Sequence, residues 1–251
     1  MSQTAAAAGA SVDPAEIAKF TAMAEAWWDP QGKFRPLHRL NPVRLTYIRD
    51  CCAARFKRDG KARRPLAGLS LVDIGCGGGL LCEPLARLGA RVTGIDAGAR
   101  NIAIAQSHAR DSELEIDYRE ATAESLAAAG ERFDVVLAME VVEHVADPAG
   151  FLAACSQLVA PGGLLIVATL NRTAKSFTFA IIGAEYLLRW LPRGTHDWRR
   201  FLRPSEMAGM IRPQGLALGE TMGVVYSPLG DNWRLAASDL DVNYMMRFER
   251  N

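Results

Sequence analysis

The stretch that decides the fold is residues 71–96, LVDIGCGGGLLCEPLARLGARVTGID. A short apolar run leads into a turn with four glycines in five positions, 75–79. A helical pattern follows and leads to a second apolar run that ends in Asp96. Glycine permits positive φ angles and lets a ligand lie directly on the backbone. Strand, glycine turn, helix and strand in this order predict the first unit of a parallel α/β sheet, whose ligands bind at the carboxyl ends of the strands.

Two features of the glycine turn narrow the choice of ligand. A dinucleotide fingerprint needs a third glycine where this chain has Leu80, and Asp73 would stand close to a pyrophosphate. S-adenosylmethionine (SAM) has no phosphate, but carries a sulfonium and an ammonium. Asp96 follows Gly75 at about the twenty-residue spacing of a ribose-binding acid. We expect it to accept both ribose hydroxyls of a SAM molecule that lies against Gly75 and Gly77. The alternatives are a tight turn that binds nothing and, least favoured, an NAD-dependent enzyme.

Composition limits the fold and the partners. A chain of 251 residues is long enough for one large α/β domain. Its 29 basic and 28 acidic residues give a net charge of +1, without the basic excess that is usual in a duplex-binding surface. We therefore expect no nucleic-acid partner. Five cysteines, an odd number without disulfide or zinc spacing, are typical of a reducing compartment.

The sequence pattern shows no signal peptide and no membrane span. Residues 1–10 are rich in alanine and lack a basic region and an apolar core. No run reaches the roughly 18 apolar residues that cross a membrane. We therefore expect a disordered leader over 1–12, a single domain over 13–251 and a cytoplasmic location.

The N-terminal part of the domain, residues 13–58, is expected to hold two helices. The first begins at Asp13, an N-cap followed by proline, and ends in the sequence WWDP (27–30). The second begins at Asn41. Arg44 then lies in the first turn of that helix, where the helix dipole disfavours a cation. This placement indicates either a function, such as holding the SAM carboxylate, or an ordinary surface arginine.

Helices and strands alternate through most of the remaining chain, which predicts a doubly wound parallel sheet. We expect a helix over 99–109 and further strands over 114–118, 133–138, 163–169, 216–222 and 233–237. A mostly parallel, seven-stranded sheet whose last strand is antiparallel is the α/β plan of class I SAM-dependent methyltransferases. Ala123 and Glu124 follow the strand predicted over 114–118, where a backbone amide and an acid could read adenine.

Glu140, Glu143 and His144 directly follow the strand predicted over 133–138 and Met139. If a helical turn begins there, their spacing of i, i+3 and i+4 puts the three side chains on one face. Two carboxylates and an imidazole at a sheet edge can bind a divalent cation, and the oxygen-rich set favours Mg²⁺ or Mn²⁺. The alternative is two solvated acids and a histidine that caps the turn.

A metal ion at this position would suit the methylation of a catechol. A phenol with a pKa of about 10 is a poor nucleophile at neutral pH. A cation bound to both catechol oxygens lowers that pKa and orients the attacking oxygen. Without a metal, His144 or His196 would have to act as general base.

Residues 171–203 interrupt the alternation and form a long insertion that we expect to face the substrate or lipid. Within it, residues 176–191 (SFTFAIIGAEYLLRWL) are apolar except for one narrow polar stripe. This pattern favours a lid or an interfacial helix that handles a greasy substrate near acidic lipid headgroups. A helix packed in the core or in a dimer interface is equally consistent with it.

Several sequence blocks, spread over residues 13–246, together resemble the family of ubiquinone-biosynthesis O-methyltransferases. The glycine turn alone is shared by many methyltransferases, whereas the sequences WWD, GTHDW and DVNYM are specific. The blocks are EIAKF (16–20), WWDP (27–30), FRPLHRLNPVRLTYI (34–48), DIGCGGGLL (73–81), MEVVEHV (139–145), LNRTAKSF (170–177), GAEYLLRWLPRGTHDW (183–198) and LDVNYM (240–245).

The resemblance implies a SAM-dependent enzyme that methylates phenolic hydroxyls of polyprenyl catechol intermediates at both O-methylation steps of ubiquinone biosynthesis. It also implies peripheral association with the inner membrane through residues 171–191, and an assembly of ubiquinone-biosynthesis enzymes as a further partner. The SAM contacts of the family fall on Arg44, Gly75, Asp96 and Met139. The metal ligands of some members, which imply Mg²⁺, fall on Glu140, Glu143 and His144.

Three other functions stay open at this stage. One is a non-catalytic SAM-binding scaffold, which the polar residues after Met139 disfavour. Another is a methyltransferase of a different small phenol. The third is a methyltransferase of RNA or protein, which the net charge and the apolar insertion disfavour.

Overall fold

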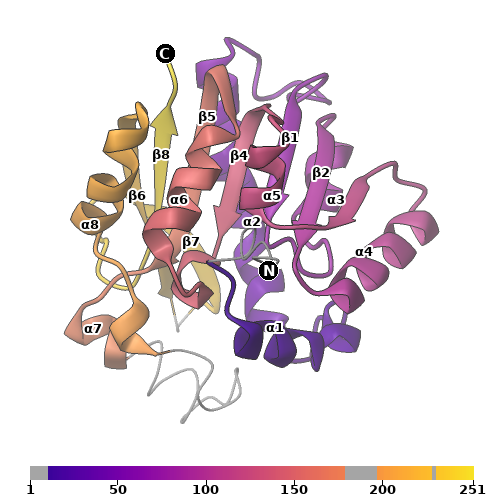
Figure 1. Cartoon of the computed structure of the whole chain (residues 1–251), viewed down its shortest axis with the longest axis horizontal. Coiled ribbons are helices and arrows are strands. Elements are labelled where there is room, and N and C mark those ends of the chain that lie inside the picture. Colours follow the sequence, from indigo (N-terminus) through magenta and orange to yellow (C-terminus); the bar gives the residue numbers. More distant parts are fainter. Residues whose placement is uncertain (1–10, 179–196, 228–229) are drawn as a thin grey trace, which may run out of the picture.

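One eight-stranded sheet forms the centre of the molecule (Figure 1). The computed structural model describes residues 11–178, 197–227 and 230–251. The spatial order of the strands is β3-β2-β1-β4-β5-β8-β6-β7. In chain order the strands are β1 Ser70–Ile74, β2 Arg91–Asp96, β3 Asp117–Glu120, β4 Phe133–Met139, β5 Val159–Leu170, β6 Ala217–Ser227, β7 Asn232–Ala236 and β8 Asn243–Glu249.

The strands β3, β2, β1, β4 and β5 are parallel, as the sequence predicts. Strand β8 pairs antiparallel with β5, β6 pairs antiparallel with β8, and β7 pairs antiparallel with β6. The class I methyltransferase plan is therefore confirmed, with one strand more than expected. The stretch predicted over 233–237 is the edge strand β7, and the strand beside β5 is β8, which the sequence pattern did not reveal.

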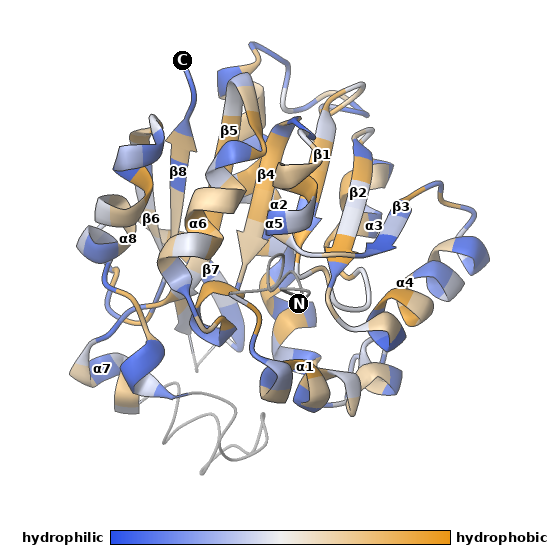
Figure 2. Cartoon of the chain, in the orientation of Figure 1, coloured by the Kyte–Doolittle hydropathy of each residue, from blue (hydrophilic) through white to orange (hydrophobic). Residues whose placement is uncertain are grey.

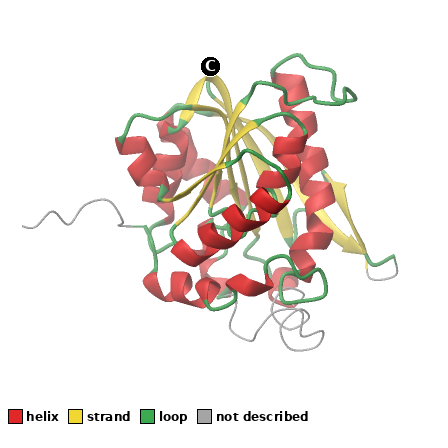
Figure 3. Ribbon diagram, turned by 90° about the vertical axis from the view of Figure 1, so that its right-hand side faces the viewer, coloured by secondary structure: helices red, strands yellow, loops and turns green. Residues whose placement is uncertain are grey.

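Helices cover both faces of the sheet, which gives three layers (Figure 3). Helices α2, α3 and α4 pack on one face and α5, α6 and α8 on the other, each over its own buried apolar cluster. The central strands between them are apolar along most of their length (Figure 2). The bounds are α1 Pro14–Thr21, α2 Arg35–Arg55, α3 Cys82–Arg87, α4 Ala99–Asp111, α5 Ala123–Ala128, α6 Pro148–Gln157, α7 Ala174–Ser176 and α8 Pro204–Ile211.

The N-terminal helices begin and end at other residues than predicted. Helix α1 starts after the Asp13 cap, as expected, but ends at Thr21, and a separate short 3₁₀ turn follows it. Helix α2 starts at Arg35 and runs through Pro42, although a proline in a helix interior removes one backbone hydrogen bond. Arg44 therefore lies well inside the helix and is buried, so the argument from the helix dipole was wrong.

Two further segments depart from the sequence-based boundaries. The third strand pairs with β2 over Asp117–Glu120, and the expected first residues of that strand, 114–116, lead into it. Ser11, assigned to the leader, is only 2% exposed, and its carbonyl accepts a hydrogen bond from the amide of Ala146. The folded part of the chain therefore includes Ser11, while residues 1–10 lie outside the described residues.

The insertion is described at its two ends only. It contributes the short helix α7 and a 3₁₀ turn at Trp198–Arg200. Most of the helix expected over 176–191, and His196, lie outside the described residues. Among the helices that the structure describes, none is long and apolar enough to span a membrane.

Candidate active site

A cavity of about 900 Å³ follows the edge at which the parallel strands end. This volume lies near the upper end of the range of small-molecule sites, roughly 300–1,000 Å³, and leaves room for a donor and an acceptor together. Gly77 and Glu143, although predicted for the site, are not among the lining residues. Eight other predicted residues line the cavity: Arg44, Gly75, Asp96, Ala123, Glu124, Met139, Glu140 and His144.

The glycine turn brings backbone to the cavity where side chains would not fit. Gly75 has a φ of +70° and Gly77 a φ of +54°, which only glycine adopts without strain. A Cβ atom on Gly75 would lie 2.6 Å from the side chain of Val141. The amide of Gly75 donates to the carbonyl of Ile95, which ties the turn to the end of β2.

Asp96 closes strand β2 beside the glycine turn. Its Oδ2 accepts a hydrogen bond from the amide of Gly77 at 3.0 Å. Its Oδ1 accepts one from the amide of Gly98 at 2.8 Å and one from Nδ2 of Asn101 at 3.0 Å. Burial raises the pKa of Asp96, while the three N–H donors oppose that rise. Since a carboxylate has roughly four lone-pair positions, this arrangement leaves one, on Oδ2, for a ribose hydroxyl rather than the two expected.

Glu124 lies in the first turn of α5, next to Ala123, and faces the N-terminal segment of the chain. Its Oε1 accepts a hydrogen bond from the hydroxyl of Ser11. Its other oxygen, Oε2, is buried and has no hydrogen-bond partner among the described residues. A buried acceptor without a partner is costly, so this atom is suited to an N–H donor such as the amino group of adenine.

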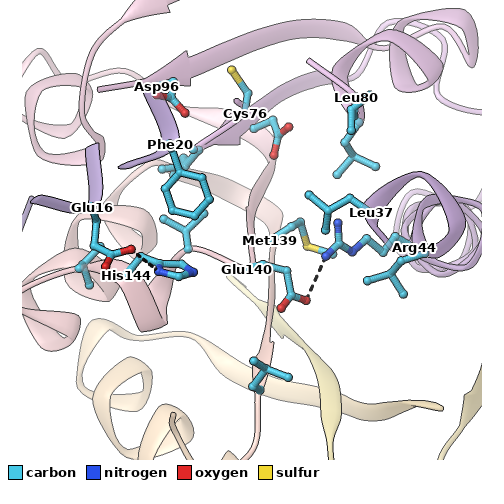
Figure 4. A pocket seen from close by; sticks show the side chains of 18 of the residues that line it. Glu16, Phe20, Leu37, Arg44, Cys76, Leu80, Asp96, Met139, Glu140 and His144 are labelled. Atoms are coloured by element: carbon cyan, nitrogen blue, oxygen red, sulfur yellow. Dashed lines mark hydrogen bonds and ion pairs between the residues drawn. The ribbon is translucent and has the colours of Figure 1, made fainter. Parts of the chain in front are cut away.

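Arg44 and Glu140 form an ion pair across the cavity (Figure 4). Nη2 of Arg44 lies 3.1 Å from Oε1 of Glu140, and the arginine side chain is only 6% exposed. Glu140 has a φ of +60°, a strained conformation for a residue with a side chain. Nε of Arg44 is buried without a hydrogen-bond partner among the described residues, so the guanidinium keeps a donor for an anion.

Glu143 is buried behind the cavity wall. Its Oε2 accepts a hydrogen bond from the hydroxyl of Thr169 at 2.8 Å. Burial, and then the negative charge of Glu140, raise the pKa of Glu143 well above its ordinary value. The environment of Glu143 therefore favours its protonated form.

His144 faces helix α1. Its Nδ1 lies 2.8 Å from Oε2 of Glu16, and its ring meets Phe20 edge to face at 5.1 Å between centroids. This hydrogen bond lowers the pKa of Glu16 and keeps it ionised. An ionised carboxylate can only accept, so Nδ1 of His144 carries a proton. Sequence reasoning missed Glu16, although it belongs to the EIAKF block.

The three predicted metal ligands do not converge in this arrangement. Glu140 is turned toward Arg44 and His144 toward Glu16 (Figure 4), while Glu143 bonds to Thr169. The reason is local: Glu140 has a left-handed backbone conformation and precedes a 3₁₀ turn, so the helical spacing i, i+3, i+4 does not hold. Within the described ranges, no group of three or more His, Cys, Asp or Glu side chains is placed to hold a metal ion.

The far half of the cavity is mostly apolar and was not predicted, and Lys175, Asp239 and Asn243 also line it. It extends from the end of β5 toward the late strands, with helix α2 on the other side. Its wall comes from segments far apart in the sequence, which no local pattern connects. The apolar residues of this wall are Leu37, Leu40, Leu170, Val224, Val225, Trp233 and Val242.

Asp73, in strand β1 just before the glycine turn, is a buried acid. Asp73 is 3% exposed, lines the cavity, and accepts a hydrogen bond from the thiol of Cys82 at 3.3 Å. Burial raises the pKa of Asp73 to about 7. An acid here suits a ligand with a positive charge and disfavours a pyrophosphate, as the sequence indicates.

Known proteins resemble the chain over nearly its whole length. Residues 72–167 match the family model of the methyltransferase domain. A ubiquinone biosynthesis O-methyltransferase of Cereibacter sphaeroides is 60% identical over 235 residues, which are 94% of this chain and 95% of that protein. Proteins of the same name from Parvibaculum lavamentivorans and Brucella ovis are 59% and 58% identical, and the matches cover 97% and 96% of this chain and 96% of each relative.

Solved structures show the same fold at low sequence identity. A SAM-dependent methyltransferase from Thermotoga maritima superposes with a TM-score of 0.63 at 19% identity, over 94% of this chain and 99% of that one. Magnesium protoporphyrin IX methyltransferase from Synechocystis, solved with bound SAH, gives 0.60 at 19% identity, over 93% and 94%. Because the fold, the arrangement of the sheet edge and the high identity of full-length relatives agree, the chain belongs to the ubiquinone biosynthesis O-methyltransferase family.

Proposed function

We propose that the protein transfers the methyl group of SAM to a phenolic oxygen of a polyprenyl catechol, at both O-methylation steps of ubiquinone biosynthesis. One observation carries the proposal: the same cavity is lined by the residues assigned to the donor and by apolar residues of helix α2 and strands β6 and β7. The two halves meet at Met139, Glu140 and His144. An acceptor with a polar aromatic head and a hydrocarbon tail matches this division.

The donor half supplies groups that match each part of SAM. The backbone of the glycine turn and the acid Asp96 suit the ribose, and the buried Oε2 of Glu124 suits adenine. Arg44 has a buried N–H donor for the carboxylate. Asp73, with its pKa near neutrality, offers a negative charge to the cationic end of the donor. We propose that these groups bind the donor with its methyl group directed past Met139.

The transfer itself is a direct displacement. The phenolic oxygen attacks the methyl carbon, an O–C bond forms as the C–S bond breaks, and S-adenosylhomocysteine (SAH) leaves. The phenolic proton must go to a base, because the neutral phenol is a weak nucleophile. We propose His144 for this role, since the carboxylate of Glu16 at Nδ1 would stabilise the imidazolium that forms.

Methyl transfer from radiolabelled SAM to a short-prenyl catechol tests this function. We expect product with the catechol and none with its dimethyl ether, which has no hydroxyl left. Acceptors with longer prenyl chains should have lower KM values. Equal KM values for a catechol with and without a prenyl chain would instead identify a methyltransferase of another small phenol. SAM binding without transfer to any phenol would identify a scaffold.

The role of Mg²⁺ is a separate proposal that rests on the family resemblance. A site made of Glu140, Glu143 and His144 would require Glu140 to leave Arg44 and His144 to leave Glu16. Activity measured after chelation, and then across a Mg²⁺ titration, distinguishes proton removal by His144 alone from metal-assisted deprotonation. Full activity with chelator would rule out the metal, whereas strict dependence on Mg²⁺ would require the three side chains to rearrange.

We also propose that the protein associates peripherally with the cytoplasmic face of the inner membrane through residues 171–191, and with other enzymes of the pathway. The support is the apolar sequence of residues 176–191, which basic residues flank. Sedimentation with anionic vesicles tests this. Deletion of 176–191 should abolish sedimentation and leave the Kd for SAM unchanged, and a loss of both would show that the segment belongs to the core. Pull-down of pathway enzymes from membranes would test the assembly.

A further inference from the structure

The side chain of Asn101 links a tryptophan to the acid Asp96. Asn101 lies in the first turn of α4 and is only 2% exposed. Its Nδ2 donates to Oδ1 of Asp96 at 3.0 Å, and its Oδ1 accepts from Nε1 of Trp27 at 3.0 Å. An indole can only donate, so it selects the oxygen of the amide and turns the nitrogen toward the acid.

Trp27 is itself held firmly between two surfaces. One face of the ring stacks on Phe34, with centroids 3.7 Å apart and planes 5° from parallel. The ring also lies on the glycine turn, where a Cβ atom on Gly77 would come within 2.3 Å of the ring and one on Gly78 within 2.5 Å of its Cγ atom. These contacts leave the indole N–H little freedom to point anywhere but at Asn101.

The neighbouring residues fix the same segment to the glycine turn. Nε1 of Trp28 donates to the carbonyl of Gly78 at 2.9 Å. The ring of Trp28 stacks on His108, with centroids 3.4 Å apart. Nε2 of His38 lies 2.9 Å from the carbonyl of Trp27. Trp27 and Trp28 therefore both pack over the glycine turn, rather than simply ending a helix.

We propose that Trp27 and Asn101 are positioning residues that set the orientation of Asp96 and thereby determine how the protein reads the ribose of its donor. The inference rests on SAM as the donor. Asp96 has one lone-pair position left, on Oδ2, and the donors on Oδ1 fix where that position points. Without the indole N–H, the oxygen of the Asn101 amide loses the donor that fixes the plane of the amide, and its hydrogen bond to Oδ1 of Asp96 is less well oriented. The carboxylate is then held less firmly, and the ribose hydroxyl loses an aligned acceptor.

Binding of SAH and of its 2′-deoxy and 3′-deoxy forms provides the test. The wild type should bind SAH at least about tenfold more tightly than the form that lacks the recognised hydroxyl, as for a hydrogen bond to a charged group. Trp27→Phe keeps a stacked ring and removes only the N–H donor. It should raise the Kd for SAH several-fold, leave the Kd for that deoxy form nearly unchanged, and so reduce the discrimination. Asn101→Ala, which removes the amide between Trp27 and Asp96, should reduce the discrimination in the same way.

A purely structural role gives a different result. Tyr244→Phe removes a comparable buried hydrogen bond, from the tyrosine hydroxyl to the carbonyl of Leu202, and should leave all three Kd values unchanged. If Trp27→Phe weakens SAH and the deoxy forms equally, the tryptophan supports only the fold and the proposal fails. It also fails if both variants keep the wild-type discrimination, or if the wild type does not discriminate.

The outcome is distinguishable from a failure of the donor assignment. A wild type that binds no SAH would overturn SAM as the donor. If the wild type distinguishes SAH from its deoxy form and both variants do so equally well, only the positioning role of Trp27 and Asn101 is overturned.

Discussion

Glu16 and His144 lie far apart in the sequence, yet their side chains meet at 2.8 Å in the wall of the cavity. Helix α1 thus contributes a carboxylate to the cavity, beside residues from the strand ends and from helices α2 and α5. If His144 accepts the phenolic proton, the negative charge of Glu16 stabilises the imidazolium that forms.

Replacing this carboxylate by an amide of the same shape should slow the chemical step. We expect Glu16→Gln to lower kcat about tenfold or more, since the imidazolium loses its counter-charge. The KM for SAM should stay within about twofold, because Glu16 makes no contact with the groups assigned to the donor. Steady-state kinetics with a short-prenyl catechol measures both. Glu25→Gln is the matched control, because Glu25 is exposed and pairs only with Arg100 among the described residues. An unchanged kcat in Glu16→Gln would contradict the role of His144 as base.

Most residues that the sequence predicts for donor binding line the cavity, but their hydrogen-bond partners were not predicted. The positions of Gly75, Asp96 and Glu124 follow from the strand–turn–helix order, because the ends of parallel strands must meet at one edge. The partners of these residues do not follow, because Ser11, Glu16 and Trp27 reach the edge from a separate N-terminal segment. The metal site was predicted from helical spacing, and the positive φ of Glu140 breaks that spacing.

At the level of elements, the glycine turn carries the strictest steric requirement. Gly75→Ala would combine a positive φ with a Cβ atom 2.6 Å from the side chain of Val141. We expect a loss of about 2–4 kcal/mol of stability and at least tenfold weaker SAM binding. Chemical denaturation and calorimetric titration measure the two effects.

A second glycine separates backbone strain from steric contact. Gly130 has a φ of +77°, but a Cβ atom there would meet nothing within 4 Å. Gly130→Ala should therefore lose only about 1–2 kcal/mol and bind SAM normally. Equal effects of the two substitutions would mean that the contact with Val141 is unimportant.

The hairpin of β6 and β7 forms the outer wall of the apolar half of the cavity, where Trp233 and Val224 line it. If this half holds the prenyl chain, Trp233→Ala should raise the KM for long-chain acceptors about fivefold or more, from the lost apolar contact. The KM for an acceptor without a prenyl chain should change little. Leu218→Ala, at the exposed end of β6, is the control and should change neither value. An equal rise in KM for all acceptors would show that the prenyl chain does not bind against Trp233.

Some helices and strands are easier to predict from the sequence than others. The buried parts of strands β1, β2, β4 and β5 are mostly apolar, and they were found. Strand β8 is also buried, but its sequence NYMMRFE has polar ends and two methionines and resembles neither an alternating nor a β-branched strand. The start of α2 was missed because Pro42, which looks like a helix start, lies inside the helix.

At the level of the whole molecule, Asp73 makes stability depend on pH. Its pKa is about 7 in the folded protein and near the ordinary 3.8 when unfolded, so the folded state binds more protons between these values. The contribution of Asp73 to stability is therefore lost as the pH rises from about 4 to 7.

Asp73→Asn removes this titration. We expect the variant to gain stability relative to the wild type across that pH range, by on the order of 2–4 kcal/mol, and the difference to level off above about pH 8. Denaturant unfolding of both proteins without SAM, from pH 4.5 to 8.5, measures the difference. A difference that stays constant with pH would show that Asp73 does not change its protonation in this range.

The order of the strands also constrains the order in which the molecule can be made. Strand β8 follows β6 and β7 in the chain but lies between them and β5 in the sheet. During synthesis, strands β1 to β5, whose ends surround the donor half of the cavity, can form their sheet while later residues are still inside the ribosome. The hairpin of β6 and β7, which walls the apolar half, cannot join this sheet until β8 emerges. A nascent chain halted before β8 should therefore have the donor half of its cavity in place and the apolar half incomplete.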